Sequence, residues 1–130
     1  MLASLTPDDL DALADARLHD AEALLAAGRF DGARYVCGYA VELKLKARIC
    51  RAHGWEEYPP VPQLAQALKT HNLLVLLLLS TMQTTILSQH GQYWWVVVPW
   101  TPEQRYATAA VTAQDAQTMI DAARALMAVL

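Results

Sequence analysis

Apolar residues recur at helical spacing in three stretches of the chain. These stretches run from Leu10 to Leu25, from Val36 to Cys50 and from Ala116 to Met127. Within each of them the apolar positions lie three or four residues apart, which places them on one face of an α-helix. The pattern predicts an all-α protein whose amphipathic helices bury these faces against one another.

Capping residues indicate where the first two helices begin and end. The run Thr6–Asp9 favours a helix start, because threonine caps, proline suits the first turn and aspartates favour the positive end of the helix dipole. Gly28 is expected to end this helix. We expect the second helix to begin with Asp31 as its N-cap and to run to His53, where Gly54 ends it.

The middle of the chain is less regular. The proline-rich residues 54–62 predict a loop, and a short helix is expected over 63–69. A third main helix is expected over 73–89, and its first seven residues are apolar on every side, which indicates burial on every side. Residues 94–98 have strand propensity but no partner strand, so we predict an extended connection. The last helix is expected over 112–130.

Glycines interrupt the second helix at Gly32 and Gly38, although a glycine inside a helix costs ~1 kcal/mol relative to alanine. We expect the close approach of a neighbouring helix to be the reason. The sequence as a whole predicts one domain over residues 1–130. Its fold class is all-α, an up-and-down bundle of four to five helices with a long Pro/Trp-rich connection before the last helix.

Composition adds an expectation of self-association. Hydrophobic residues make up 55% of the chain and charged residues only 18%, against typical values of ~45–50% and ~25%. Some of this apolar excess is expected in a subunit interface, and a homodimer is the commonest soluble oligomer. The net charge of −3 provides no global basic field, so any nucleic-acid contact must be local.

The cysteines and the apolar runs indicate in which cellular compartment the protein resides. Cys37 and Cys50 fall on one predicted helix, about 20 Å apart at ~1.5 Å per residue, which is too far for a disulfide. Free thiols fit a reducing cytoplasm. The N-terminal residues lack the features of a signal peptide, and the run Leu73–Leu79 is far shorter than a membrane span. We expect a cytoplasmic protein without membrane contact.

Four segments, in order, resemble HEPN domains. Residues 28–35 and 38–47 are similar to the first helical hairpin of that family. Thr70–Leu73 is close to its Thr-His-Asp-Leu, and Trp100–Tyr106 is close to its Trp-x-Pro-Glu-x-Arg-Tyr. The alanine-rich last helix follows. The resemblance covers most of the chain from about residue 15 onward.

The resemblance implies a bundle of four to five helices that is usually dimeric and is associated with nucleotide or RNA binding. Many HEPN domains are metal-independent ribonucleases that use an Arg-x(4–6)-His motif. Others have lost this motif and accompany a minimal nucleotidyltransferase in toxin–antitoxin or defence systems. Asn72 stands where the family usually has aspartate, which removes a charge from that position.

The chain contains one Arg-x4-His pair, Arg48 and His53. A histidine can accept the proton of a ribose hydroxyl, and an arginine can stabilise the charge of the transition state. However, family members carry the motif in their later helices, whereas residues 105–130 of this chain contain no histidine. A basic helix terminus, favoured by the helix dipole, is the commoner explanation. We therefore expect a non-catalytic domain, with RNA cleavage as the alternative.

Five residues are candidates for ligand binding. Glu42 and Lys46 match a recurrent pair of the family, but they equally predict a partly buried ion pair four residues apart. His71 lies at a helix start, where it either contacts an anion or simply belongs to the junction. Arg105 and Tyr106 match the end of the Trp-x-Pro-Glu-x-Arg-Tyr segment, where they either order the loop or bind a partner.

Two further groups of side chains fit both a functional and a structural role. Lys44, Arg48 and Arg51 form a basic stripe that fits phosphates, although a solvated face is the commoner explanation. The tryptophans near residue 100 and Tyr106 suit base stacking, although such aromatics are more often core. No spacing typical of a metal site, a Ser-His-Asp triad or a phosphate-binding loop occurs, so no cofactor is expected.

The resemblance thus implies a HEPN-type domain that binds nucleotide or RNA, or a nucleotidyltransferase partner. A pure protein-interaction bundle is the remaining alternative.

Overall fold

A computed structural model describes residues 5–130, and within them the regular structure is helical. The fold class is therefore all-α, as predicted. The α-helices are α1 (Pro7–Ala26), α2 (Phe30–His53), α3 (Ala65–Leu68), α4 (Leu73–Leu79), α5 (Gln83–Gln89), α6 (Gly91–Val97) and α7 (Ala113–Met127), with short 3₁₀ turns at η1 (Pro62–Leu64) and η2 (Pro102–Tyr106).

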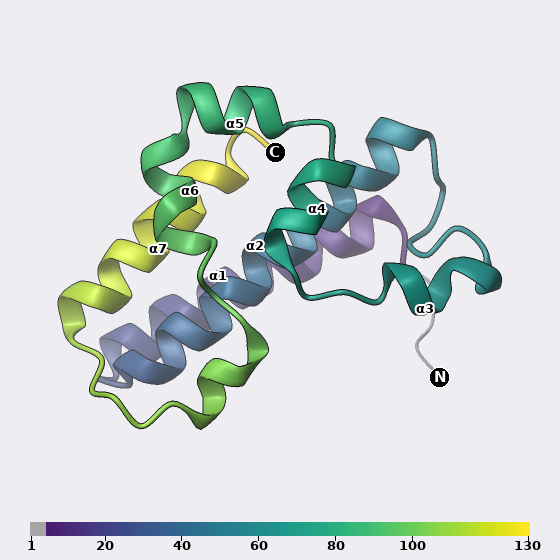
Figure 1. The fold of residues 1–130 in the computed structure, drawn as a ribbon. Coiled ribbons are helices and arrows are strands. Elements are labelled where there is room, and N and C mark those ends of the chain that lie inside the picture. The colour runs from purple at the N-terminus through teal and green to yellow at the C-terminus, as the bar shows by residue number, and fades with distance from the viewer. Residues whose placement is uncertain (1–4) are drawn as a thin grey trace.

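The long helix α2 runs through the middle of the molecule (Figure 1). Helix α1 packs along it as an antiparallel hairpin partner, α7 crosses it, and α4 lies on its other side. Because α2 has neighbours on several sides, many of its side chains are fully buried, among them Val41, Leu45 and Ile49. The inward positions expected for the last helix are confirmed, since Ala116, Met119, Ile120, Ala123, Leu126 and Met127 are all buried.

The helix ends follow the predicted capping chemistry in part. The Thr6 hydroxyl accepts a hydrogen bond from Asp9 N, and the Asp9 carboxylate accepts one from Thr6 N. Gly54 ends α2 in the left-handed conformation with φ 69°. The expected cap at Asp31 is wrong, because α2 begins at Phe30 and Asp31 lies in its first turn.

The expected helix over 73–89 is interrupted. Ser80, Thr81 and Met82 separate α4 from α5, and Thr81 has φ 64°. The buried Ser80 hydroxyl donates to Leu77 O at 2.6 Å and accepts from Met82 N at 3.2 Å, so it satisfies backbone groups at the break. The expected burial of α4 on every side is also wrong, because Leu74, Val75 and Leu78 are exposed.

Residues 94–97 belong to helix α6 and Val98 directly follows it, so the predicted extended connection is wrong. Within α6, Trp94 and Val97 lie three residues apart and are both buried, whereas Trp95 and Val96 are exposed. Helix α6 packs against α7. This tertiary contact outweighs the strand propensity of the Trp-Trp-Val-Val run. The part of the chain that the structure describes thus has more helices than the four to five expected.

At Gly38 a neighbouring side chain approaches the backbone of α2 closely. A Cβ at this position would overlap the indole ring of Trp100. The Trp100 Nε1–H donates to Tyr35 O at 2.9 Å, which fixes the ring against α2. The sequence correctly indicated a close approach at Gly38, but the neighbour is a buried tryptophan and not a helix.

The remaining structural expectations concern the thiols and the membrane. Cys37 and Cys50 are both buried and unpaired, as predicted. Burial raises the pKa of Cys37 to about 12, so this thiol is inert at neutral pH. Over the described range 5–130, every helix is too short or too polar to cross a membrane.

Candidate functional site

A buried carboxylate connects α2 to the junction before α4. Glu42 is only 3% exposed. Its Oε2 lies 3.2 Å from Lys46 Nζ, and its Oε1 lies 2.7 Å from His71 Nδ1. The pair four residues apart on α2 was expected from the spacing. The structure adds His71, which the sequence did not connect to Glu42.

The contact with Glu42 defines the tautomer of His71. An ionised carboxylate only accepts hydrogen bonds, so Nδ1 must carry the proton that points at Glu42. Nε2 is then the acceptor nitrogen of the neutral ring. Lys46 stabilises the ionised carboxylate from the other side, and its Nζ also lies 5.4 Å from the centre of the Tyr58 ring.

His71 sits in an aromatic cluster on one side of α2. The ring of Tyr39 packs edge-on against both His71 and Trp100, with centroid distances of 6.1 Å and 4.8 Å. The Tyr39 hydroxyl lies 3.2 Å from that of Tyr35. Burial, followed by the hydrogen bond with Tyr35, raises the pKa of Tyr39 to about 12. The phenol is therefore neutral at physiological pH and provides a fixed wall.

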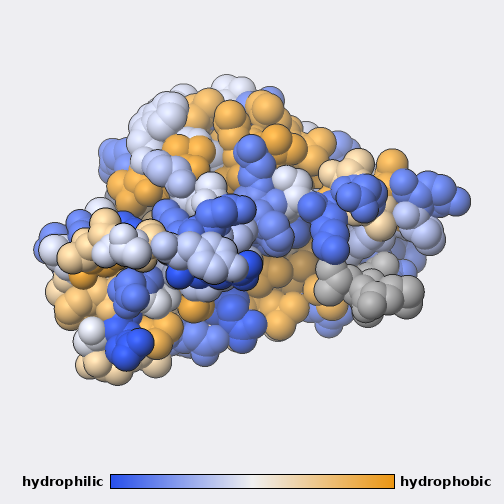
Figure 2. Space-filling model, turned by 60° about the horizontal axis from the view of Figure 1, so that its bottom comes forward, coloured by the Kyte–Doolittle hydropathy of each residue, from blue (hydrophilic) through white to orange (hydrophobic). Residues whose placement is uncertain are grey.

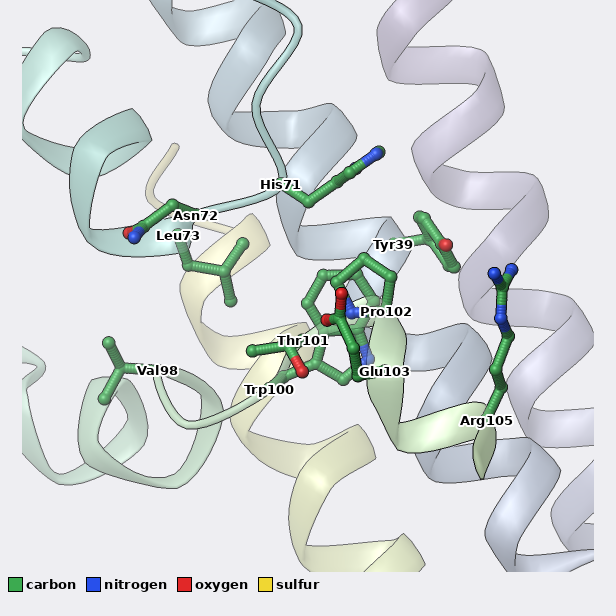
Figure 3. A pocket seen from close by; sticks show the side chains of 10 residues that line it. All are labelled: Tyr39, His71, Asn72, Leu73, Val98, Trp100, Thr101, Pro102, Glu103 and Arg105. Atoms are coloured by element: carbon green, nitrogen blue, oxygen red, sulfur yellow. The ribbon is translucent and has the colours of Figure 1, made fainter. Parts of the chain in front are cut away.

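A hollow of about 480 Å³ opens beside this cluster. Its walls come from α2, from the start of α4 and from the segment that includes η2 (Figure 3). The titratable side chains that line it are Tyr39, His71, Glu103 and Arg105, and the other lining residues are Asn72, Leu73, Val98, Trp100, Thr101 and Pro102. The hollow thus joins parts of the chain that are far apart in sequence, and we call it the His71–Arg105 hollow.

Arg105 of η2 lines this hollow, and Tyr106 directly follows it in the chain. Figure 3 shows Arg105 extending from η2 towards Tyr39. The Arg105 guanidinium carbon lies 4.8 Å from the centre of the Tyr106 ring, and both residues are exposed. Hydrogen bonding to Tyr106 and to Tyr35 holds the pKa of Arg105 above its ordinary value. A permanent cation and an exposed aromatic face therefore lie side by side.

Arg48 and His53 are not brought into this hollow. His53 Nε2 lies 2.8 Å from Leu79 O, and its ring stacks on Trp55 at 5.1 Å. Arg48 Nε is buried and has no hydrogen-bond partner among the described residues. Neither residue lines the hollow. These contacts fit the structural explanation of the Arg-x4-His pair, in which His53 links the end of α2 to α4.

The basic stripe of α2 is largely neutralised by α1. Lys44 Nζ lies 2.9 Å from Asp11 Oδ1. Arg51 contacts Asp11 at 2.7 Å and Asp8 at 3.2 Å. Lys44 and Arg51 therefore join the two helices of the first hairpin and are not free to bind a phosphate, whereas Arg48 forms no ion pair among the described residues.

Fewer of the aromatic residues near residue 100 lie in the core than expected. Trp94 and Trp100 are buried, whereas Trp95 and Tyr106 are exposed. Trp95 is not among the residues that line the hollow. Trp100 lines the hollow but is buried. Tyr106 does not line the hollow, but it directly follows Arg105, which does, so its exposed ring lies beside the hollow and suits stacking against a base.

Several lining residues were not singled out from the sequence. Tyr39 lies three residues before Glu42 on α2, so helical spacing alone was enough to place it on the same face. Thr101 and Glu103 precede Arg105 in a segment whose path depends on where Trp100 is buried. No local pattern predicts that packing.

The hollow offers a mixed set of binding groups. His71 provides a hydrogen-bond acceptor, Arg105 a cation and Glu103 a carboxylate, with apolar walls between them. Over residues 5–130 no cluster of three or more His, Cys, Asp or Glu side chains is arranged to hold a metal ion. The arrangement suits a polar organic anion of moderate size better than a bare metal ion.

Comparison with models of protein families, with curated proteins and with solved structures gave no match.

Proposed function

We propose that this chain is a HEPN-type domain that binds a nucleotide, or a nucleotide unit of RNA, in the His71–Arg105 hollow. One observation carries the proposal. His71 and Arg105 come from different parts of the chain and line the same hollow, and both are candidate ligand residues from the HEPN resemblance. The proposed ligand is therefore held by side chains that meet only in the folded protein.

The groups around the hollow match the parts of a nucleotide. The planar guanidinium of Arg105 suits bidentate contact with a phosphate. The exposed ring of Tyr106 offers a face for base stacking, worth ~1–3 kcal/mol per base. Glu103 and His71 Nε2 accept hydrogen bonds, so they suit ribose hydroxyls.

The biological setting is proposed from the resemblance alone. We propose a non-catalytic cytoplasmic partner of a minimal nucleotidyltransferase, as in toxin–antitoxin or defence systems. The protein partner and the nucleotide are compatible, because a nucleotidyltransferase itself handles nucleotides.

A binding titration with matched variants tests the ligand proposal. Purified protein is titrated with AMP and with a short fluorescent oligoribonucleotide, using the wild type, Arg105→Gln and Arg29→Gln. Arg29 is also exposed but lies at the start of α2, outside the hollow. Loss of the charged hydrogen bond to the phosphate predicts about tenfold weaker binding for Arg105→Gln only. Equal affinities of the two variants for AMP and for the oligoribonucleotide would contradict the proposal.

A second candidate function is metal-independent RNA cleavage, favoured by the 2.7 Å contact between Glu42 and His71. This contact orients the ring, so His71 Nε2 is suited to take the proton of a ribose 2′-hydroxyl. The oxygen then attacks the adjacent phosphorus and expels the 5′-oxygen, which takes a proton from water. Arg105 is suited to stabilise the charge on the phosphoryl oxygens.

RNA cleavage in the presence of EDTA tests this second candidate. His71→Ala and His53→Ala are compared, because both remove an imidazole but only His71 lines the hollow. Activity lost in His71→Ala and kept in His53→Ala would establish the catalytic function. An inactive wild type that still binds nucleotide leaves the first proposal standing. A protein without either property would be a pure interaction bundle.

A further inference from the structure

A second cavity lies where the start of α1, the middle of α2, the segment after α2 and α3 meet. Its volume is about 310 Å³, and it shares no lining residue with the His71–Arg105 hollow. Its apolar lining residues are Leu5, Leu10, Leu43, Tyr58, Pro59, Ala65 and Leu68, and its polar lining residues are Lys46, Gln66 and Lys69. We call it the Lys46–Lys69 pocket. The proposed nucleotide site makes no use of it.

The walls of this pocket are held together by hydrogen bonds between segments far apart in the chain. Leu5 N donates to Tyr58 O at 3.2 Å, and Tyr58 N donates to Leu5 O at 2.8 Å. The Tyr58 hydroxyl donates to Leu68 O at 2.7 Å. These bonds connect the residue before Thr6, the segment after α2 and helix α3. The pocket is therefore present in the folded chain without a ligand, as most small-molecule sites are.

The floor and the mouth of the pocket differ in exposure and polarity. Leu10 and Leu68 are buried, whereas Gln66 and Lys69 are exposed. Figure 2 looks at the molecule from its lower side in Figure 1, where α3 and η2 lie, and shows apolar side chains between and beneath hydrophilic ones. A ligand with an apolar body and a polar head matches this division.

The charged side chains that line the pocket are all positive. Lys46 and Lys69 line it, and no Asp or Glu of residues 5–130 does. Lys46 Nζ lies 3.2 Å from Glu42 Oε2, so the charge of Lys46 is compensated. The ion pairs of lysines in the described part of the chain belong to Lys44 and Lys46, so Lys69 has none. Burial raises the pKa of Tyr58 to about 12, so its phenol adds no negative charge at neutral pH.

We propose that the Lys46–Lys69 pocket binds an organic monocarboxylate with an apolar body, such as a medium-chain fatty acid. The apolar body packs on Leu10 and Leu68, which removes it from water. The carboxylate lies at the mouth and pairs with Lys69. The ammonium of Lys46 has three N–H donors and uses one for Glu42, so it also donates to the ligand.

Charge and size limit the ligand further. Because Glu42 compensates Lys46, the pocket has one cation without a partner, Lys69, and a single negative charge on the ligand balances it. A cationic head is repelled by both lysines. The volume of about 310 Å³ lies at the lower end of the ~300–1,000 Å³ typical of ligand pockets, which favours a ligand with one short chain or one ring.

Isothermal titration calorimetry with octanoate, below the concentration at which it forms micelles, tests this proposal. Acetate has the same head without the tail, and octylammonium has the same tail with the opposite charge. The wild type is expected to bind one octanoate per chain. Acetate is expected to bind at least tenfold more weakly, because burial of only two methylene groups accounts for about a factor of ten. Octylammonium is expected to bind at least tenfold more weakly because of the two lysines.

Two pairs of variants locate the ligand. Ala65→Phe places a ring in the pocket, and Ala67→Phe is the matched control, because Ala67 lies on the same helix but is exposed and does not line the pocket. Octanoate is expected to bind at least tenfold more weakly to Ala65→Phe only. Lys69→Gln is expected to bind it about two- to fivefold more weakly, as for the loss of an exposed ion pair, and Arg29→Gln, outside the pocket, as tightly as the wild type.

The contrary results are equally clear. The proposal is contradicted by a wild type that does not bind octanoate, and by octylammonium that binds as tightly as octanoate. Equal affinities of Ala65→Phe and Ala67→Phe would place the ligand elsewhere. Far-UV circular dichroism verifies that each variant is folded, and Lys69→Gln, a surface substitution, decides the result if Ala65→Phe is not. AMP binding is measured separately, so failure of the nucleotide proposal leaves this one standing.

Discussion

At the scale of single residues, Glu42 links the two halves of the candidate site. It is buried, and it contacts Lys46 at 3.2 Å and His71 at 2.7 Å. A charged pair of this kind is costly to break, because removing one partner leaves the other without compensation. Glu42 thus positions His71 and also stabilises the packing of the 71–73 junction on α2.

Glu42→Gln is expected to lower the free energy of unfolding by ~1–3 kcal/mol, since it keeps an acceptor but removes the charge that Lys46 and His71 face. Glu22→Gln is the control, because Glu22 also pairs with an arginine, at 3.2 Å, but its side chain is 41% exposed. A loss of only ~0–1 kcal/mol is expected there. Urea unfolding of both variants measures the difference, and equal losses would contradict the account.

Two glycines of α2 are expected to respond to alanine with opposite signs. At Gly38 the new methyl overlaps the Trp100 ring, so overpacking should cost ~1–3 kcal/mol. At Gly32 the nearest atom is Leu24 Cδ1 at 3.6 Å, an ordinary contact, so alanine should gain up to ~1 kcal/mol from helix propensity. Thermal unfolding measures both. A stabilised Gly38→Ala would show that Trp100 is not held against α2.

At the scale of elements, α1 and α2 are joined by ion pairs centred on Asp11. Burial acts to raise its pKa, but hydrogen bonds from Arg51 and Lys44 outweigh it and hold the pKa of Asp11 below the ordinary 3.8. A carboxyl whose pKa is lowered by folding contributes stability above the unfolded pKa. That contribution is lost as the pH falls through the folded value.

The free energy of unfolding is therefore expected to fall below about pH 4, and Asp11→Asn should weaken this dependence. At pH 7 the variant should be less stable by roughly 0.5–1 kcal/mol, as for other partly exposed ion pairs. Asp15→Asn, an exposed position on the same helix, is the control. Urea unfolding between pH 2.5 and pH 7 measures the effect. If the free energy of unfolding of Asp11→Asn depended on pH as strongly as that of the wild type, this expectation would be contradicted.

The break between α4 and α5 depends on Thr81, a β-branched residue with φ 64°. The left-handed conformation costs such a residue ~1–2 kcal/mol, whereas glycine adopts it freely. Glycine also adds conformational entropy to the unfolded chain, which offsets part of this gain. Thr81→Gly should still stabilise the protein by ~0.5–1 kcal/mol. Thr84→Gly, inside α5, should instead destabilise it by a similar amount. Destabilisation of both variants, measured by thermal unfolding, would contradict this interpretation.

These elements show which parts of the fold could be predicted from the sequence. Helices α1, α2 and α7 have long apolar stripes, so periodicity located them to within a few residues. The break at Thr81 was missed, because leucines on both sides continue the helical pattern. Helix α6 was missed because Trp94 and Val97 gain more from burial against α7 than the local strand propensity indicates.

Some contacts of the candidate site could likewise be predicted from the sequence, and others could not. Glu42 and Lys46 lie four residues apart on one helix, so their contact followed from spacing. The contact from Glu42 to His71 spans separate elements and depends on the path of the 54–72 segment. The approach of Arg105 towards Tyr39 depends on the burial of Trp100. Local patterns carry no information about such distant contacts.

At the scale of the whole molecule, the structure has two surfaces of different character. The His71–Arg105 hollow combines a cation and a carboxylate, and the exposed ring of Tyr106 lies beside it. The surface of α4, α5 and α6 is apolar, with Leu78 and Trp95 exposed, and belongs to a stretch without formal charge. The hollow has the polar groups that a small polar ligand needs, whereas the surface of α4, α5 and α6 offers few of them.

The most direct test of the central claim is an NMR titration of ¹⁵N-labelled protein with AMP. The account predicts saturable shifts of the backbone amides of residues 71–73, 101, 103 and 105, which line the hollow. In Arg105→Gln the same shifts should require about tenfold more AMP, because the charged hydrogen bond to the phosphate is lost. The absence of saturable shifts, or shifts confined to α1 and the outer side of α7, would contradict the assignment of this hollow as a nucleotide site.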